Sequence, residues 1–350
     1  MKHGIRLAVV GLLLGCSANE DPGGFDPRQP DDGSGAKGGA LASAGGSGPG
    51  VGGFNAAGGS GAGECGPTCS YDGHDVLDCR GNVVQECQGA DGCDDVEATC
   101  ADACAVAVKN RHAVGCEYWA TFMDTYQEFA CFAAFVANTW DTPAHITVDY
   151  AGVSLPVGTF AYLPKGAGPT LTYEPFDASA GIPPGEVAIL FLGGPQLDDP
   201  PPLSATCPMP SAVPYGAMLH KATGVGASFR IGSDVPVVAY QINPYGGGSA
   251  AVTAASLLLP TSVWDTDYVA VNVYEHDIDD PSMNIVATED DTQITFWPTK
   301  PVLGGGGIPS GQPNVPLELT LNRGEHAQIT QPEALTGSCL LYTSPSPRDS

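Results

Sequence analysis

Residues 118–338 form a succession of short strand-like segments, and this feature restricts the possible folds most strongly. Within each segment, β-branched and aromatic residues alternate with polar ones, and glycine, proline or aspartate separates it from the next. The segments recur roughly every ten residues, a spacing typical of all-β domains. Long helical periodicity is missing from this region. We therefore expect an all-β fold of tandem antiparallel β-sandwich-like modules, with a β-propeller-like arrangement as the alternative.

Residues 226–245 are the clearest example of this pattern. Phe229 and Ile231 alternate with polar neighbours, which suits a half-buried strand. Residues 235–242 are rich in valine and end before Asn243-Pro244, as a second strand does. Because Gly232-Ser-Asp234 between them has turn chemistry, we predict two strands joined by a turn.

A weak internal repeat divides the region into two modules. Residues 134–138 lead through a turn to a strand at 146–150, and residues 284–288 lead in the same way to a strand at 293–297. This comparison aligns Ala134 with Asn284. Gly181-Ile-Pro-Pro-Gly185 and Gly307-Ile-Pro-Ser-Gly311 also match, and each precedes an apolar strand.

The N-terminus has the features of a lipoprotein signal peptide. Lys2 and Arg6 precede an apolar run that is too short to span a bilayer, and Leu13-Leu-Gly-Cys16 resembles a bacterial lipobox. We expect residues 1–16 to be the signal and Cys16 to become lipidated. Ser17, rather than aspartate, follows Cys16, which predicts an outer-membrane lipoprotein of a Gram-negative-type bacterium. Residues 17–63, rich in glycine, serine and alanine, are expected to be a disordered tether.

Residues 64–117 form a cysteine-rich module. A segment this short cannot bury a sufficient apolar core, so disulfides are expected to stabilise it in an oxidising compartment. Zinc is the alternative, but no Cys-x-x-Cys pair occurs. Residues 94–109 are expected to contain a short helix. The cysteines expected in disulfides are Cys65, Cys69, Cys79, Cys87, Cys93, Cys100, Cys104 and Cys116 here, and Cys131 and Cys207 in the β region.

Residues 339–350 have an unusual composition. The run Cys339-Leu-Leu-Tyr-Thr-Ser-Pro-Ser-Pro-Arg-Asp349 resembles the in-frame translation of a transposase-end sequencing adapter. We therefore expect the natural chain to depart from this sequence after about Ser338 and the second module to be truncated there. In the first module, the matching position leads into the strands at 228–242.

Charge and motifs restrict the function. The net charge of -26 repels phosphate backbones, which argues against nucleic acid as a partner. No nucleophile elbow, zinc-protease helix, phosphate-binding loop or EF-hand occurs. Two acidic loops flank the strand at 284–288, and their carboxylates are weak candidates for calcium, with two solvated loops as the favoured interpretation. These candidates are Glu275, Asp277, Asp279, Asp280, Glu289, Asp290 and Asp291. Trp264, Tyr268, Tyr274 and Trp297 are either an exposed aromatic face or core residues, and core packing is the more frequent use.

The β region resembles the IgGFc-binding-protein N-terminal family. The resemblance rests on Thr261-Ser-Val-Trp-Asp-Thr-Asp-Tyr268, Leu319-Thr-Leu-Asn-Arg-Gly-Glu325, Leu335-Thr-Gly-Ser338 and Ser233-Asp-Val-Pro-Val-Val-Ala239, with the strands at 284–295 in the family's order. It covers about residues 118–338 and implies a secreted or surface binding protein. No catalytic residues are carried over from the family, and the ligand in its name does not transfer by fold alone.

We therefore expect a non-enzymatic, lipid-anchored surface protein that binds or adheres to an extracellular protein or glycan, with no required cofactor. Its contact with the membrane is expected through the lipid alone. An exported hydrolase acting on polysaccharide is one alternative, with Asp277 or Asp280 paired with Glu289. A protease inhibitor built on the cysteine-rich module is another.

Overall fold

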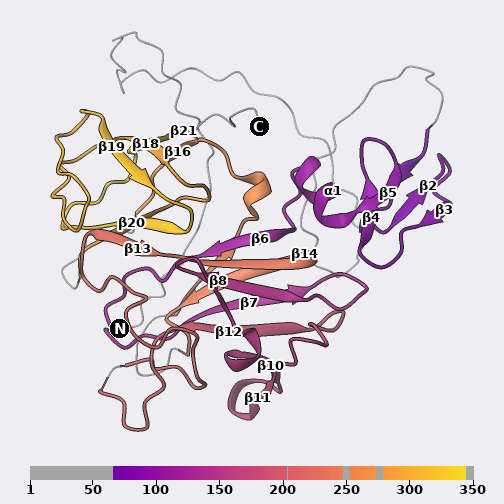
Figure 1. The fold of residues 1–350 in the computed structure, drawn as a ribbon, viewed down its shortest axis with the longest axis horizontal. Helices are drawn as coiled ribbons and strands as arrows, with labels where there is room; N and C mark the ends of the chain where they lie inside the picture. Colours follow the sequence, from indigo (N-terminus) through magenta and orange to yellow (C-terminus); the bar gives the residue numbers. More distant parts are fainter. Residues whose placement is uncertain (1–65, 203, 247–252, 273–278, 344–350) are drawn as a thin grey trace, which may run out of the picture. The chain divides into compact units, whose positions relative to one another are not determined.

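The computed structural model describes residues 66–343, apart from 203, 247–252 and 273–278 (Figure 1). Cys16, the tether, Cys65, Tyr274, Glu275 and Asp277 lie outside the described residues. Strands predominate, so the expected all-β class is confirmed. No helix among the described residues is long and apolar enough to cross a membrane.

The first module consists of two groups of antiparallel strands that share the long strand β14. One group pairs β9, β8 and β6 with the first half of β14, and the other pairs β11, β10, β12, β7 and β15 with its second half. Figure 1 shows β14 running alongside β7 and β8. The strands are β6 (Gly115–Ala120), β7 (Phe132–Asn138), β8 (Ile146–Tyr150), β9 (Val153–Leu155), β10 (Ala161–Lys165), β11 (Thr172–Pro175), β12 (Val187–Gly193), β14 (Phe229–Asn243) and β15 (Ala254–Leu258).

Strand β14 corrects the prediction of two strands joined by a turn. Residues 229–233 pair with β8, and residues 237–242 pair with β7 along the same edge. The ladder to β6 shifts register between Gly232 and Val237. The turn-like residues therefore form an irregular bend inside one strand, which then passes from one group of strands to the other.

The core of this module lies between its two groups of strands. The rings of Phe132 on β7 and Phe229 on β14 have centroids 6.1 Å apart, and both side chains are fully buried. The hydroxyl of Tyr118 donates to the carbonyl of Val237 and accepts from the amide of Gly115. Burial raises the pKa of Tyr118 to about 12, so this phenol stays neutral. All nine strands of the module belong to one continuous hydrogen-bonded sheet around this core.

The second module repeats this arrangement with separate sheets. One sheet has the order β16-β21-β18-β19 and the other β13-β20-β17, and Ile294, Phe296 and Ile329 are buried in their common core. Strand β21 pairs with β18 and β16 as the first half of β14 pairs with β8 and β6. The strands are β13 (Gly224–Ala227), β16 (Asp267–Val269), β17 (Ser282–Val286), β18 (Thr292–Trp297), β19 (Leu317–Leu321), β20 (Glu325–Thr330) and β21 (Cys339–Thr343). The segment that resembles a translated adapter therefore forms β21. Its place in the sheet is independent of where its codons come from.

Hydrogen bonds fix the register of the repeat. The amide of Asn138 donates to the carbonyl of Glu186 at 3.0 Å, and its carbonyl accepts from the amide of Gly185 at 2.9 Å. Ala287 makes the same pair of bonds, at 3.0 Å with Glu325 and at 2.9 Å with Gly324. Ala287 is therefore equivalent to Asn138.

This register corrects two details of the sequence alignment. The alignment of Ala134 with Asn284 is wrong by one residue, because it places Thr288 rather than Ala287 opposite Asn138. The match between the two Gly-Ile-Pro motifs does not hold either. The first motif precedes β12, which pairs with β7, whereas the second precedes β19, which pairs with β18.

Strand β13 joins the two modules. It pairs with β20 of the second module and is followed, after Ser228, by β14 of the first. His326 on β20 is fully buried here, with its Nδ1 3.3 Å from the Ser228 hydroxyl. Burial lowers its pKa to about 4, so the imidazole is neutral at pH 7.

The cysteine-rich module contains small strands and one helix. The helix α1 (Ala103–Lys109) begins after Asp102, whose carboxylate accepts from the Ala105 amide at 2.8 Å. The short helix expected within residues 94–109 is therefore confirmed, and residues 94–102 belong largely to strands and turns. The strands are β1 (Thr68–Cys69), β2 (Asp75–Leu77), β3 (Val83–Glu86), β4 (Asp91–Asp94) and β5 (Thr99–Asp102).

Candidate functional site

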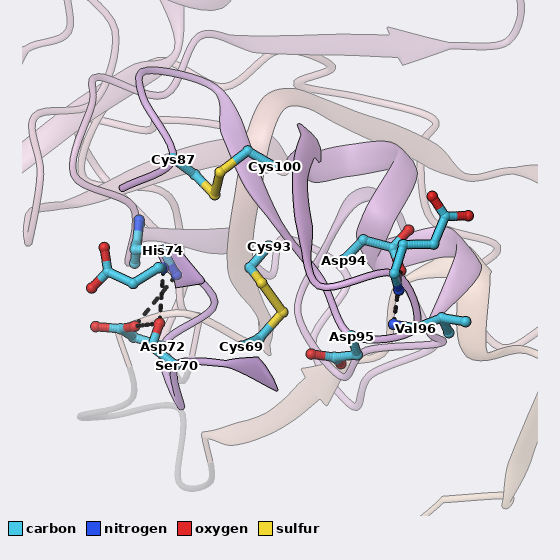
Figure 2. The surroundings of a disulfide bond; sticks show 12 residues. Cys69, Ser70, Asp72, His74, Cys87, Cys93, Asp94, Asp95, Val96 and Cys100 are labelled. Atoms are coloured by element: carbon cyan, nitrogen blue, oxygen red, sulfur yellow. Dashed lines mark hydrogen bonds between the residues drawn. A yellow bond between two sulfur atoms is a disulfide. The ribbon is translucent and has the colours of Figure 1, made fainter. Parts of the chain in front are cut away.

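Disulfides hold the cysteine-rich module together. Figure 2 shows Cys69–Cys93 and Cys87–Cys100, which bridge neighbouring strands and loops of this module. Cys104–Cys116 links α1 to β6, and Cys131–Cys207 lies in the first β module. The bonded cysteines are not available as zinc ligands. Four disulfides indicate an oxidising compartment, as in exported proteins.

Cys79 is exposed and has no disulfide partner among the described residues. Cys65 lies outside the described residues, so the disulfide bonds expected of Cys65 and Cys79 stay predictions, and peptide mapping without reduction tests them.

The acidic side chains around these disulfides make internal hydrogen bonds. Asp72 accepts from the Ser70 hydroxyl at 2.6 Å, which holds the pKa of the carboxyl below its usual value. Asp94 accepts from the Lys109 ammonium at 2.6 Å and from the Val96 amide at 2.8 Å, and its pKa is lowered in the same way. Figure 2 shows Asp72 and Asp94 directed at these loops rather than at a common point. Their role is to order turns of the module.

The acidic loops of the second module lie apart. Asp279 and Asp280 precede β17, and Glu289, Asp290 and Asp291 follow it. Two loops at opposite ends of a five-residue strand are separated by its rise of roughly 16 Å. This exceeds the carboxylate separation of about 5–9.5 Å that glycoside hydrolysis requires, so Asp280 and Glu289 do not form such a pair. Within the described residues, no group of three or more acidic, histidine or cysteine side chains is arranged to hold a metal.

These loops have other contacts. Asp279 lies 3.6 Å from the Lys221 ammonium, and Asp290 accepts from the Arg323 amide at 3.1 Å. The expected aromatic candidates are also dispersed. Tyr268 packs on Tyr342 in an edge arrangement at 5.4 Å, and the Trp264 indole donates to the Leu259 carbonyl at 3.0 Å. Both rings, like Trp297, are half-buried, and the structure does not bring them together as one exposed face.

Two adjacent hollows occur in loops of the first module. They have volumes of about 270 and 340 Å³ and share Glu128 and Phe129 as lining residues. Tyr215 lines the first and Tyr126 the second, and their side chains are 66% and 52% exposed. Prolines form much of the remaining wall, at positions 195 and 214 in the first hollow and 201 and 202 in the second. Exposed aromatic rings beside a hollow are typical of binding surfaces.

A buried carboxylate supports the loops around these hollows. Asp124 accepts from the Lys221 amide at 2.9 Å and lies 3.5 Å from the His220 imidazole. Its own amide donates to Gln328 on β20 at 3.2 Å, so the loops are tied to the second module. Burial is the main cause of the raised pKa of Asp124. The Lys221 ammonium lies 5.0 Å from the Tyr126 ring centroid, in a cation–π contact that orients both side chains.

The polar groups of this lining are partly engaged within the protein. The Ser204 hydroxyl in the second hollow donates to the Pro201 carbonyl at 2.6 Å, so it is engaged by the backbone. The lining offers stacking surfaces, one ammonium and one exposed carboxylate. Sequence patterns do not reveal these hollows, because the loops have no strand or helix periodicity. The available signal was the proline-rich stretch at 195–214 beside isolated tyrosines.

Comparison with known proteins identifies the second module. Residues 254–347 match the family model described as IgGFc binding protein. This segment is therefore similar to the IgGFc binding protein family. The match begins at β15 and includes all strands from β16 to β21, so the expected resemblance is confirmed there. No curated protein and no solved structure matches the chain.

Proposed function

We propose that the chain is an exported, lipid-anchored surface protein that binds an extracellular protein or glycan and does not catalyse a reaction. The match of residues 254–347 to the IgGFc binding protein family carries this proposal, because the family is a binding family. The disulfides and the lipobox-like Leu13-Leu-Gly-Cys16 support export and anchoring. The two hollows near Tyr126 and Tyr215 are the binding surface we assign to this function.

Binding is tested by immobilising the full chain and measuring the response to an immunoglobulin Fc fragment, purified extracellular glycoproteins and polysaccharides. We expect saturable binding to at least one probe and no breakdown of any. The double variant Tyr126→Ala/Tyr215→Ala is expected to weaken that binding, whereas Tyr71→Ala, which alters an exposed tyrosine in the cysteine-rich module, is the matched control. Cleavage of a probe, or binding that is unchanged in the double variant, contradicts the assignment.

Anchoring is tested separately by growing cells with an alkyne fatty acid. We expect the native chain to take up label and the Cys16→Ala variant to take up none. Label on the variant contradicts a lipid at Cys16.

A further inference from the structure

The first hollow, beside Tyr215, is the feature from which we draw a further inference. Its wall contains three aromatic residues, Phe122, Phe129 and Tyr215, together with the carboxylate of Glu128. None of the residues that line this hollow is lysine or arginine. The hollow therefore combines aromatic rings with a carboxylate that has no lysine or arginine beside it in the lining.

The second hollow shows how the protein itself uses such a ring. The Lys221 ammonium lies 5.0 Å from the centroid of the Tyr126 ring and 3.6 Å from the carboxylate of Asp279. A cation between an aromatic face and a carboxylate is stabilised by both, because the face of the ring is also negative. Tyr215 is 66% exposed, and the lining of its hollow supplies no such cation.

The loops that form both hollows are acidic. Residues 124–129 and 194–221 contain one lysine, no arginine and four acidic residues, which are Asp124, Glu128, Asp198 and Asp199. The one imidazole in the first hollow, that of His220, has its Nδ1 3.5 Å from the buried Asp124 carboxylate, so an acidic group already lies next to it. A surface of this charge attracts cations and repels anionic ligands.

The lining suits a guanidinium better than an ammonium. A guanidinium is planar, so it can stack on an aromatic face and donate two parallel hydrogen bonds to a carboxylate, whereas an ammonium is a compact and strongly hydrated charge. The apolar stem of an arginine would contact Phe129 and Pro214 of the wall. The second hollow, which shares Glu128 and Phe129, extends the surface for residues that flank the arginine in a partner chain.

We propose that the first hollow binds an arginine side chain of a protein partner, with its guanidinium stacked on Tyr215 and paired with the carboxylate of Glu128. This inference rests on the proposed function and narrows the partner to a protein that exposes an arginine. Tyr215 and Glu128 select the cation, and the second hollow accommodates the neighbouring residues.

The first test compares two peptides that differ in charge and share one shape. The full chain is titrated, with NMR detection, with acetyl-Gly-Arg-Gly-amide and with the same peptide containing citrulline, a neutral analogue of arginine. We expect the arginine peptide to bind about tenfold more tightly, because stacking and pairing both require the charge. Equal affinity contradicts the proposal. A lysine peptide that binds as tightly as the arginine peptide contradicts a stacked guanidinium.

The second test assigns the binding to the two residues. Glu128→Gln removes the charge and keeps the shape, and Tyr215→Leu removes the ring. Each should weaken binding of the arginine peptide by about tenfold and leave the citrulline peptide unchanged. Glu174→Gln, which alters an exposed carboxylate on β11, is the matched control. Unchanged affinity in either variant contradicts the proposal, and the citrulline comparison does not depend on the variants folding.

This inference and the proposed function fail in different ways. If the immobilised chain binds a glycoprotein or a polysaccharide and the arginine peptide does not compete, the proposed function stands and the arginine site is wrong. If the arginine peptide binds through Glu128 and Tyr215 and no macromolecular probe binds, the arginine site stands and the proposed function is wrong.

Discussion

The two β modules share one architecture and differ in the continuity of a single strand. In the first, β14 pairs with both groups of strands. Its bend therefore joins the two groups through the chain itself and through hydrogen bonds. In the second, β21 occupies the position of the first half of β14, and β17 keeps a free edge among the described residues. The first module therefore shows that one bent strand is sufficient to connect two groups of β-strands around a core.

The largest expected effect comes from the core that β14 covers. Phe229→Ala removes a fully buried ring that faces Phe132, and large-to-small changes of this kind cost about 3–5 kcal/mol. Tyr240→Ala lies on the same strand at a side chain that is 42% exposed, and should cost about 1 kcal/mol or less. Denaturant unfolding of both variants measures the difference. Similar losses would mean that β14 is not anchored by its inward face.

The Cys131–Cys207 bond further distinguishes the modules. It closes a separation of 76 residues in the first module, and the described part of the second module has no disulfide. Replacing both cysteines by alanine should destabilise the first module by about 2–5 kcal/mol. Hydrogen exchange localises the loss, and increased exchange confined to β17 and β20 would contradict this assignment.

A pH effect is expected in the second module because of His326. The hydrogen bonds that make Glu186 equivalent to Glu325 also make Val187 equivalent to His326, and valine does not titrate. The folded pKa of about 4 lies below the ordinary value of 6.5, so the unfolded chain takes up the proton first as pH falls. The contribution of the neutral imidazole to the free energy of unfolding is fully present above pH 6.5. It falls by about 3 kcal/mol as the pH approaches 4.

The measurement is denaturant unfolding across pH 4–7, with His326→Gln as the reference. Asp124, whose pKa is raised, acts in the opposite direction, because its native form takes up the proton first. The variant retains Asp124, so the difference between the two profiles isolates the imidazole. Parallel profiles would show that His326 is not buried as a neutral group.

The smallest expected effect compares the glycines before β12 and β20. Gly185 and Gly324 have φ values of 75° and 81°, a region that costs alanine about 1–2 kcal/mol. A Cβ atom at Gly185 meets no atom within 4 Å, whereas one at Gly324 lies 3.0 Å from the Trp119 ring. Gly324→Ala should therefore lower the free energy of unfolding more than Gly185→Ala. The reverse order would contradict the close approach of the Trp119 ring to Gly324.

Residue alternation predicted the all-β class and most strands, because each buried face repeats every second residue. It did not predict the bend in β14, since Gly232-Ser-Asp234 has the same local chemistry in a turn and in an irregular strand. The alignment of the two repeats by sequence is one residue out of register, because the sequence does not show which residue pairs with Gly324. The hollows near Tyr126 and Tyr215 depend on loops brought together from distant parts of the chain, which no local pattern reveals.

The central claim is that β17 is the counterpart of β7, with Ala287 in the place of Asn138. Native-state hydrogen exchange of the full chain tests it most directly. We expect slow exchange for the amides of both Asn138 and Ala287, because they donate to Glu186 and Glu325 in the same way. Rapid exchange of Ala287 beside slow exchange of Asn138 would contradict the claim.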